Sequence, residues 1–193
     1  MGNPISARLE KGMSGLILFH RFRYHLGCGF VTPEDIVLDL GCGTGYGTEI
    51  LSKIAKRVIA VDIDKDQILW NVMNYKKDNI EFICHDMEDW NIPKVDVAVA
   101  FETIEHTYHP KKVVDKLKES VKKYIVVSVP VGCETLIDVD GNIQADKDST
   151  HHSTFSNDAD FINMFVDEKW KIFTSFRSGV TLVCVFYNEE AIK

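Results

Sequence analysis

Residues 37–48 read Val37-Leu38-Asp39-Leu40-Gly41-Cys42-Gly43-Thr44-Gly45-Tyr46-Gly47-Thr48. This stretch predicts a short apolar strand that ends in an acid, then a glycine-rich turn and the start of a helix. The turn differs from the dinucleotide fingerprint G-x-G-x-x-G, because Tyr46 and Thr48 stand where its last glycine is required. It also differs from a phosphate-binding P-loop, since no lysine follows the glycines.

What remains is the pattern D-x-G-x-G-x-G over residues 39–45. This pattern resembles motif I of the class I S-adenosylmethionine (AdoMet) dependent methyltransferases. The resemblance implies that the glycines pass under the methionine and ribose of the cofactor, while Asp39 helps to hold its amino-acid portion. A sulfonium and an ammonium group favour nearby negative charge, so an acidic strand end suits this ligand. In the alternative interpretation, Asp39 only caps the turn.

Length and composition indicate one soluble globular domain over residues 1–193, with 45% apolar and 26% charged residues. The net charge of −7 disfavours a broad surface for nucleic acid or anionic membranes, although Arg8, Lys11, Arg21 and Arg23 form a candidate local basic patch. The five cysteines include no C-x-x-C pair, which predicts reduced thiols and a cytoplasmic location. The apolar run at 16–19 is too short to span a bilayer, and we expect no membrane association.

Strand and helix patterns alternate along the chain. We expect strands at 36–40, 58–64, 80–87 (with the loop that follows), 95–101, 124–129 and 180–187, and helices at 6–26, 46–56, 65–76 and 111–120. This alternation predicts an α/β fold with a Rossmann-like, doubly wound, mostly parallel sheet and helices on both faces. The resemblance implies seven strands, of which the last is antiparallel.

Acids stand at the ends of the second and third expected strands. Asp62 lies one strand-helix-strand unit after Asp39, where a carboxylate can accept both ribose hydroxyls. Asp64 is the expected N-cap of the next helix. In the methyltransferases that the chain resembles, an acid after the third strand accepts from the adenine amino group beside an apolar residue, and Asp86 and Met87 match these positions. The alternative is that Asp86 caps a turn.

Two segments are candidates for closing the site. The resemblance implies that an N-terminal helix, within residues 1–30, covers the cofactor, and Arg23-Tyr24 resembles an Arg-Tyr pair near the end of that helix. The alternative is an ordinary packing helix with a basic end. Residues 131–154 form a long, acidic, glycine-containing loop, which is typical of a lid or substrate-binding segment.

The sequence E-x-x-E-H at 102–106 follows the fourth strand. On one helical turn Glu102, Glu105 and His106 would project to one side as half of a divalent-metal site, for Mg²⁺ or Mn²⁺. A further ligand would come from His151 or His152, with His152 preferred. Without a metal, Glu102 would touch the cofactor and His106 would act as general base. The candidate catalytic residues are therefore His106 and Glu105.

Three groups of methyltransferases resemble this segment. Small-RNA 3′-terminal ribose 2′-O-methyltransferases have E-x-x-E-H and a later histidine as metal ligands, and ubiquinone-pathway O-methyltransferases have a similar segment. Bacterial stand-alone methyltransferases with Phe-Glu-Thr-Ile-Glu-His, many of them among saccharide-modifying enzymes, resemble the chain best, from about Arg21 through Phe155. The cofactor-binding set that these resemblances imply is Tyr24, Asp39, Gly41, Cys42, Gly43, Gly45, Asp62, Ile63, Asp86, Met87, Phe101 and Glu102.

The chain lacks the Asn/Asp-Pro-Pro-Tyr/Phe and Pro-Cys motifs after strand four, so DNA amino-methylation and cytosine-C5 methylation are not supported. The sequence thus predicts an AdoMet-dependent methyltransferase that acts on an oxygen of a small molecule or saccharide. Two alternatives remain. One is a metal-dependent RNA ribose 2′-O-methyltransferase, which the net charge disfavours, and the other is a non-catalytic AdoMet-binding protein.

Overall fold

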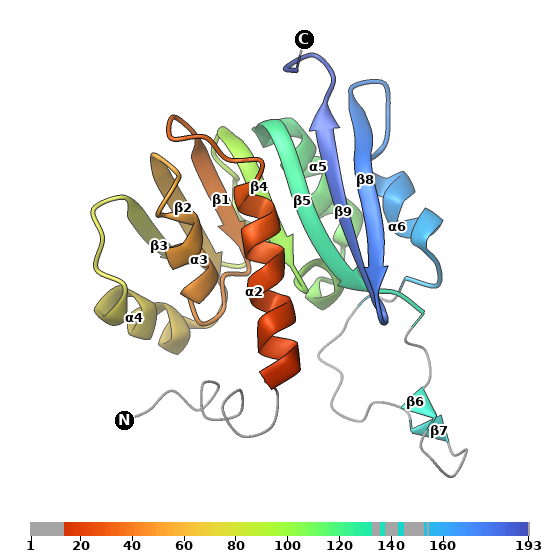
Figure 1. The fold of residues 1–193 in the computed structure, drawn as a ribbon, viewed down its shortest axis with the longest axis horizontal. Coiled ribbons are helices and arrows are strands. Elements are labelled where there is room, and N and C mark those ends of the chain that lie inside the picture. Colours follow the sequence, from red (N-terminus) through yellow and green to blue (C-terminus); the bar gives the residue numbers. More distant parts are fainter. Residues whose placement is uncertain (1–13, 133–135, 138–142, 145–152, 154, 193) are drawn as a thin grey trace.

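The computed structural model describes residues 14–132, 136–137, 143–144, 153 and 155–192. Seven strands form one sheet in the order β3-β2-β1-β4-β5-β9-β8 (Figure 1). They are β1 (Ile36–Leu40), β2 (Arg57–Asp62), β3 (Ile80–Cys84), β4 (Val95–Phe101), β5 (Val121–Pro130), β8 (Trp170–Ser178) and β9 (Thr181–Asn188). Strands β1 to β5 pair in parallel, and β9 is antiparallel to both β5 and β8. The predicted fold class is confirmed.

Helices cover both faces of this sheet (Figure 1). The helices are α2 (Ser14–Cys28), α3 (Tyr46–Leu51), α4 (Lys65–Asn74), the single 3-10 turn η1 (Ile104–His106), α5 (Pro110–Ser120) and α6 (Asp158–Phe165). A small hairpin of β6 (Leu136–Ile137) and β7 (Ile143–Gln144) lies between β5 and α6 in sequence. Of the described helices, none has the length and apolar character needed to cross a membrane.

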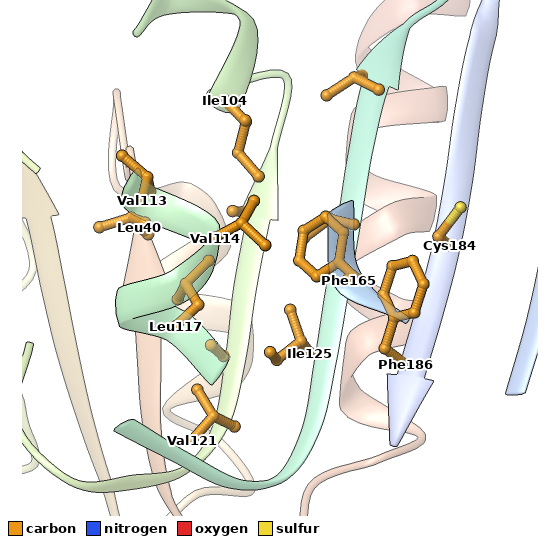
Figure 2. Packing of buried hydrophobic residues seen from close by; sticks show 14 of the residues in the cluster. Leu40, Ile104, Val113, Val114, Leu117, Val121, Ile125, Phe165, Cys184 and Phe186 are labelled. Atoms are coloured by element: carbon orange, nitrogen blue, oxygen red, sulfur yellow. The ribbon is translucent and has the colours of Figure 1, made fainter. Parts of the chain in front are cut away.

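The larger core lies between the sheet and helices α5 and α6. Figure 2 shows Leu117 of α5 and Phe165 of α6 directed toward Ile125 and Phe186 of the sheet, and all four side chains are 0% exposed. The rings of Phe165 and Phe186 stack with centroids 4.4 Å apart. Burial of each such side chain contributes about 1.5–3 kcal/mol, so this core fixes the strands that carry the site.

The site lies at the carboxyl edge of the parallel strands. In the sheet β1 stands between β2 and β4, with Asp39 in register with Ala60 and Val99. The connection after β1 leads to β2 on one side, whereas the connection after β4 leads to β5 on the other. Ligands of open α/β sheets bind where the connections diverge in this way. The predicted residues after β1, β2 and β4 therefore lie at one edge of the sheet.

The N-terminal helix ends later than predicted. Gly27 does not stop α2, which continues to Cys28. A Cβ added to Gly27 would lie 3.1 Å from Cγ1 of Val99, so this glycine lets the helix pack closely on β4. Residues 6–13 of the predicted helix, with Arg8 and Lys11, lie outside the described residues.

Helix α3 ends at Leu51, five residues before its predicted end. The Ser52 hydroxyl donates to the Glu49 carbonyl (2.8 Å), and the Asn79 amide donates to the carbonyls of Ser52 (2.8 Å) and Ala55 (3.1 Å). These side chains satisfy carbonyls that a longer helix would have used, so a turn replaces its last residues. Three other elements differ from their predicted bounds by two or three residues at one end. Strand β2 ends at Asp62, helix α4 ends at Asn74, and strand β5 begins at Val121.

Candidate cofactor and acceptor site

The glycine turn needs its glycines for two separate reasons. Gly41, Gly43 and Gly45 have φ angles of 72°, 48° and 76°, in the left-handed region that favours glycine. A Cβ on Gly41 would lie 2.4 Å from the Thr103 side chain, and one on Gly45 would lie 2.8 Å from the Asn71 side chain. A Cβ on Gly43 would meet nothing within 4 Å. The turn is thus packed on two sides and open at Gly43, where a ligand can lie against the backbone.

Asp39 is buried beneath this turn. Its carboxylate accepts from the Tyr24 hydroxyl (3.1 Å) and the Thr48 hydroxyl (2.6 Å). Burial raises the pKa of Asp39 to about 7, and the negative charge of Asp62 adds to this effect, while the two hydrogen bonds oppose it. A cationic ligand nearby would favour the ionised form. The role of Asp39 toward the amino-acid portion of the cofactor stays a prediction.

Tyr24 packs helix α2 against the start of helix α3, directly after the glycine turn. Its ring fills the space beside Gly47, where an added Cβ would lie 1.9 Å from the ring. It also packs edge-on against Phe101, with centroids 5.0 Å apart, so Tyr24 and Phe101 lie side by side as the predicted set requires. Cys42 is buried in the same turn and its thiol pKa is raised well above the usual value, chiefly by burial.

Asp62 stands at the end of β2, facing the turn. Its Oδ2 accepts from the backbone N–H of Gly43 (2.8 Å), and its Oδ1 accepts from the N–H of Asp64 (3.0 Å). The residue is partly exposed, so each oxygen keeps a lone pair for a ligand hydroxyl. Ile63, beside it, is 65% exposed. Asp64 caps α4 by accepting from two backbone N–H groups, which confirms its predicted role.

Asp86 follows β3 at the same edge and is exposed. Its carboxylate accepts from the N–H of Glu88 (2.8 Å), so it does cap a turn. The bond to Glu88 uses Oδ1 of Asp86, so Oδ2 could still accept from an adenine amino group. The adenine role of Asp86 and Met87 stays a prediction. Glu88 in turn accepts from Nδ1 of His109 (2.7 Å), which ties this loop to the start of α5.

Glu102 is held in an unusual conformation after β4. Its φ of 50° is the one positive value among the described non-glycine residues, a conformation that costs about 1–3 kcal/mol. Oε1 of Glu102 lies 3.2 Å from Nη1 of Arg23 and accepts from the Ser128 hydroxyl (2.8 Å). The Arg23 side chain is 2% exposed, so this is a buried ion pair that joins α2 to the end of β4. The backbone N–H of Glu102 also donates to the Ser128 carbonyl (2.9 Å).

Glu105 and His106 lie in different environments. Glu105 is 1% exposed, and neither carboxyl oxygen has a hydrogen-bond partner among the described residues. Burial raises its pKa to about 8, and the negative charge of Glu102 adds to the shift, whereas Arg23 opposes it. His106 is exposed. The backbone of Glu105 accepts from the N–H of Ser153 (2.9 Å), so the returning loop packs on this turn.

The described residues do not support the predicted metal half-site. Glu102, Glu105 and His106 do not share one α-helical turn, because Glu102 precedes η1 in a left-handed conformation and bonds to Arg23. In residues 14–132, 136–137, 143–144, 153 and 155–192, no group of three or more His, Cys, Asp or Glu is arranged to hold a metal ion. His151 and His152 lie outside these ranges, as does most of the predicted lid at 131–154.

Sequence reasoning assigned no role to three residues at this site: Thr48, Ser128 and Asn71. Ser128 did carry a signal, since it is the one polar residue in the apolar run 125–129 and is 0% exposed. Thr48 and Asn71 lie in helices where polar residues are ordinary, so their contacts depend on how those helices pack.

Comparisons with known proteins agree with this geometry. Residues 38–125 match a family model described as "Methyltransferase domain". Over 104 residues the chain is 38% identical to the "Probable cobalt-precorrin-6B C(15)-methyltransferase (decarboxylating)" of Methanococcus vannielii, covering 52% of this chain and 56% of that protein. Over 119 residues it is 27% identical to the "Malonyl-[acyl-carrier protein] O-methyltransferase" of Priestia megaterium, covering 60% and 42%. The chain thus spans about half the length of these curated relatives.

Among solved structures, the N-methyltransferase NodS from Bradyrhizobium japonicum, in complex with S-adenosyl-L-homocysteine, has a similar fold. The TM-score is 0.68 at 16% identity, over 97% of this chain and 94% of that chain. Over residues 38–125 the chain is thus similar to methyltransferase domains, and its glycine turn resembles that of the class I AdoMet-dependent methyltransferases. The likeness to NodS shows the fold. The family match covers the cofactor half, and the acceptor is a separate question.

Proposed function

We propose that the chain transfers a methyl group from AdoMet to an oxygen of a small molecule or saccharide. The named relatives do not select the acceptor atom, since one is a C(15)-methyltransferase and the other an O-methyltransferase. The observation that carries the proposal is the buried Glu105 carboxyl, which has no described hydrogen-bond partner at the carboxyl edge of the sheet. An unpartnered buried carboxyl with a raised pKa is suited to proton transfer.

The residues at the turn fit the cofactor. In the proposed site the ligand would lie against the open side of Gly43, and Asp62 would accept from the ribose hydroxyls. Asp39, buried beneath the turn, would supply negative charge near the amino-acid portion. Two carboxylates near one another suit a ligand that carries positive charge. When bound, AdoMet supplies the methyl group on a positively charged sulfur.

Glu105 would serve as the general base. Glu105 would take the hydroxyl proton of the acceptor as its oxygen bonds to the methyl carbon, while the methyl–sulfur bond of AdoMet would break and leave neutral S-adenosyl-L-homocysteine. The negative charge of Glu102, whose side chain is 23% exposed, acts on the Glu105 carboxyl and raises its pKa further. A base with a pKa of about 8 is well matched to neutral pH. His106, which is exposed, is the second candidate base.

The two sequence alternatives are less well supported. RNA ribose methylation depended on the metal half-site, which the described residues do not form, and the net charge of −7 opposes binding to RNA. A non-catalytic AdoMet-binding role gives no reason for a buried carboxyl without a partner. Release of S-adenosyl-L-homocysteine, measured against a panel of hydroxylated small molecules, saccharides and short RNAs, separates all three.

The rate of methyl transfer should depend on pH through Glu105. The carboxylate is the active form and the pKa is raised to about 8, so the rate should rise about tenfold per pH unit below that value and level off above it. Single-turnover rates with saturating AdoMet between about pH 5.5 and about pH 9.5, a range that brackets the raised pKa, give this profile. A profile that is flat across pH 6–9 would argue against Glu105 as the base.

A further inference from the structure

Helix α4 buries two polar side chains and leaves apolar ones exposed. Beside the apolar Ile68 (5% exposed), its buried residues are Gln67 (5%) and Asn71 (0%), whereas Leu69, Val72 and Met73 are 51%, 50% and 63% exposed. A surface helix normally directs its apolar side chains to the core. Buried amides persist only where their hydrogen bonds are satisfied, so the partners of Gln67 and Asn71 explain the arrangement.

The buried amides of Gln67 and Asn71 form hydrogen bonds that lead to the glycine turn. Nδ2 of Asn71 donates to the Gly43 carbonyl (2.7 Å), and its Oδ1 accepts from Nε2 of Gln67 (3.1 Å). The Asn71 side chain also fills the space beside Gly45, where an added Cβ would lie 2.8 Å away. On the other side, the N–H of Gly43 donates to Asp62 (2.8 Å). The residue that is open to the ligand is therefore held at both its N–H and its carbonyl.

We propose that Asn71, itself oriented by Gln67, is a positioning residue that fixes the Gly43 backbone in the conformation that binds AdoMet. The inference rests on the proposed cofactor site and goes beyond the residues that touch the ligand. A Cβ added to Gly43 would meet no atom within 4 Å, and among the described hydrogen bonds these two hold its own N–H and carbonyl. Ligand binding is weakened when a flexible backbone must first be ordered.

Titration calorimetry of AdoMet and of S-adenosyl-L-homocysteine into wild type and Asn71→Ala tests this role. We expect the Kd of both ligands to rise about 10- to 100-fold in Asn71→Ala, the effect of one lost buried hydrogen bond and a loosened turn. Asn74→Ala is the matched control, because Asn74 lies in the same helix and donates to the Trp70 carbonyl (2.7 Å) on the exposed side. Its Kd should stay within about twofold of wild type.

Gln67→Ala provides a second arm, since it keeps the Asn71 donor and removes only the group that orients it. We expect the Kd for AdoMet to rise about 3- to 10-fold. If Asn71→Ala does not fold, this variant alone tests the positioning role. Urea unfolding of each variant separates lost stability from lost affinity. If wild type binds and the folded variants bind equally well, the positioning role is wrong. If wild type itself does not bind, the proposed cofactor site is wrong.

Discussion

Glu105→Gln should lower kcat by about 10²- to 10⁴-fold, the range of a general base. The amide keeps the size and shape of the side chain but cannot accept the acceptor proton. Affinity for AdoMet should stay within about threefold of wild type, because Glu105 is not one of the predicted cofactor-binding residues and the amide has the same shape as the carboxyl. Steady-state rates at saturating AdoMet and acceptor, together with calorimetry of AdoMet, measure both quantities.

His106→Ala is the natural comparison, since His106 is the neighbouring candidate base and is exposed. We expect it to retain kcat within about tenfold of wild type. The opposite pattern, with Glu105→Gln active and His106→Ala inactive, would show that the exposed imidazole is the base. Full activity in both variants would remove general-base catalysis from this segment altogether.

Stability distinguishes a catalytic Glu105 from a structural one. The pKa of Glu105 is raised from 4.5 to about 8 in the folded chain, so the folded state holds a proton that the unfolded state releases. The stability linked to that proton is lost as pH rises through about 8. Glu105→Gln cannot ionise, and its melting temperature above pH 8 should therefore equal or exceed that of wild type. Loss of activity without loss of stability marks a residue kept for function.

Asp62→Ala should weaken AdoMet binding by about 10²- to 10³-fold. The carboxylate accepts from the N–H of Gly43 and, in the proposed site, from the ribose hydroxyls, and each hydrogen bond to a charged group contributes about 1.5–3 kcal/mol. The change thus removes a ligand contact and one of the two restraints on the turn. Calorimetry with AdoMet, run on a folded variant, gives the Kd.

Asp64→Ala is the control for this variant. Asp64 is two residues away and carries the same charge, but it caps α4 by accepting from two backbone N–H groups. Its loss should lower the free energy of unfolding by about 1 kcal/mol and change the Kd little. Equal losses of affinity in both variants would mean that net charge, rather than the contacts of Asp62, governs binding.

The cofactor half of the fold could be predicted from the sequence because its signals are local. The apolar run before Asp39, the glycine spacing and the N-cap at Asp64 each depend on neighbours along the chain, and the structure reproduces them. The parallel sheet follows from the alternation of strands and helices. These features need no knowledge of tertiary packing.

The segment after β4 could not be predicted in the same way. E-x-x-E-H reads as one helical turn, but Glu102 adopts a left-handed conformation because Arg23 and Ser128, 79 and 26 residues distant in sequence, bind its side chain. The same holds for Asn71, whose contact with Gly43 exists only once α4 packs on the turn. Long-range partners override local spacing here.

The decisive measurement is a calorimetric titration of AdoMet into the purified chain. We expect saturable binding with a Kd of about 1 µM to 1 mM, weakened about 10²- to 10³-fold in Asp62→Ala and competed by S-adenosyl-L-homocysteine. A matching rise in melting temperature with ligand concentration would support it. A folded chain that shows neither heat of binding nor a thermal shift at AdoMet concentrations several times the upper end of this Kd range would contradict the cofactor site. It would contradict the proposed methyl transfer as well.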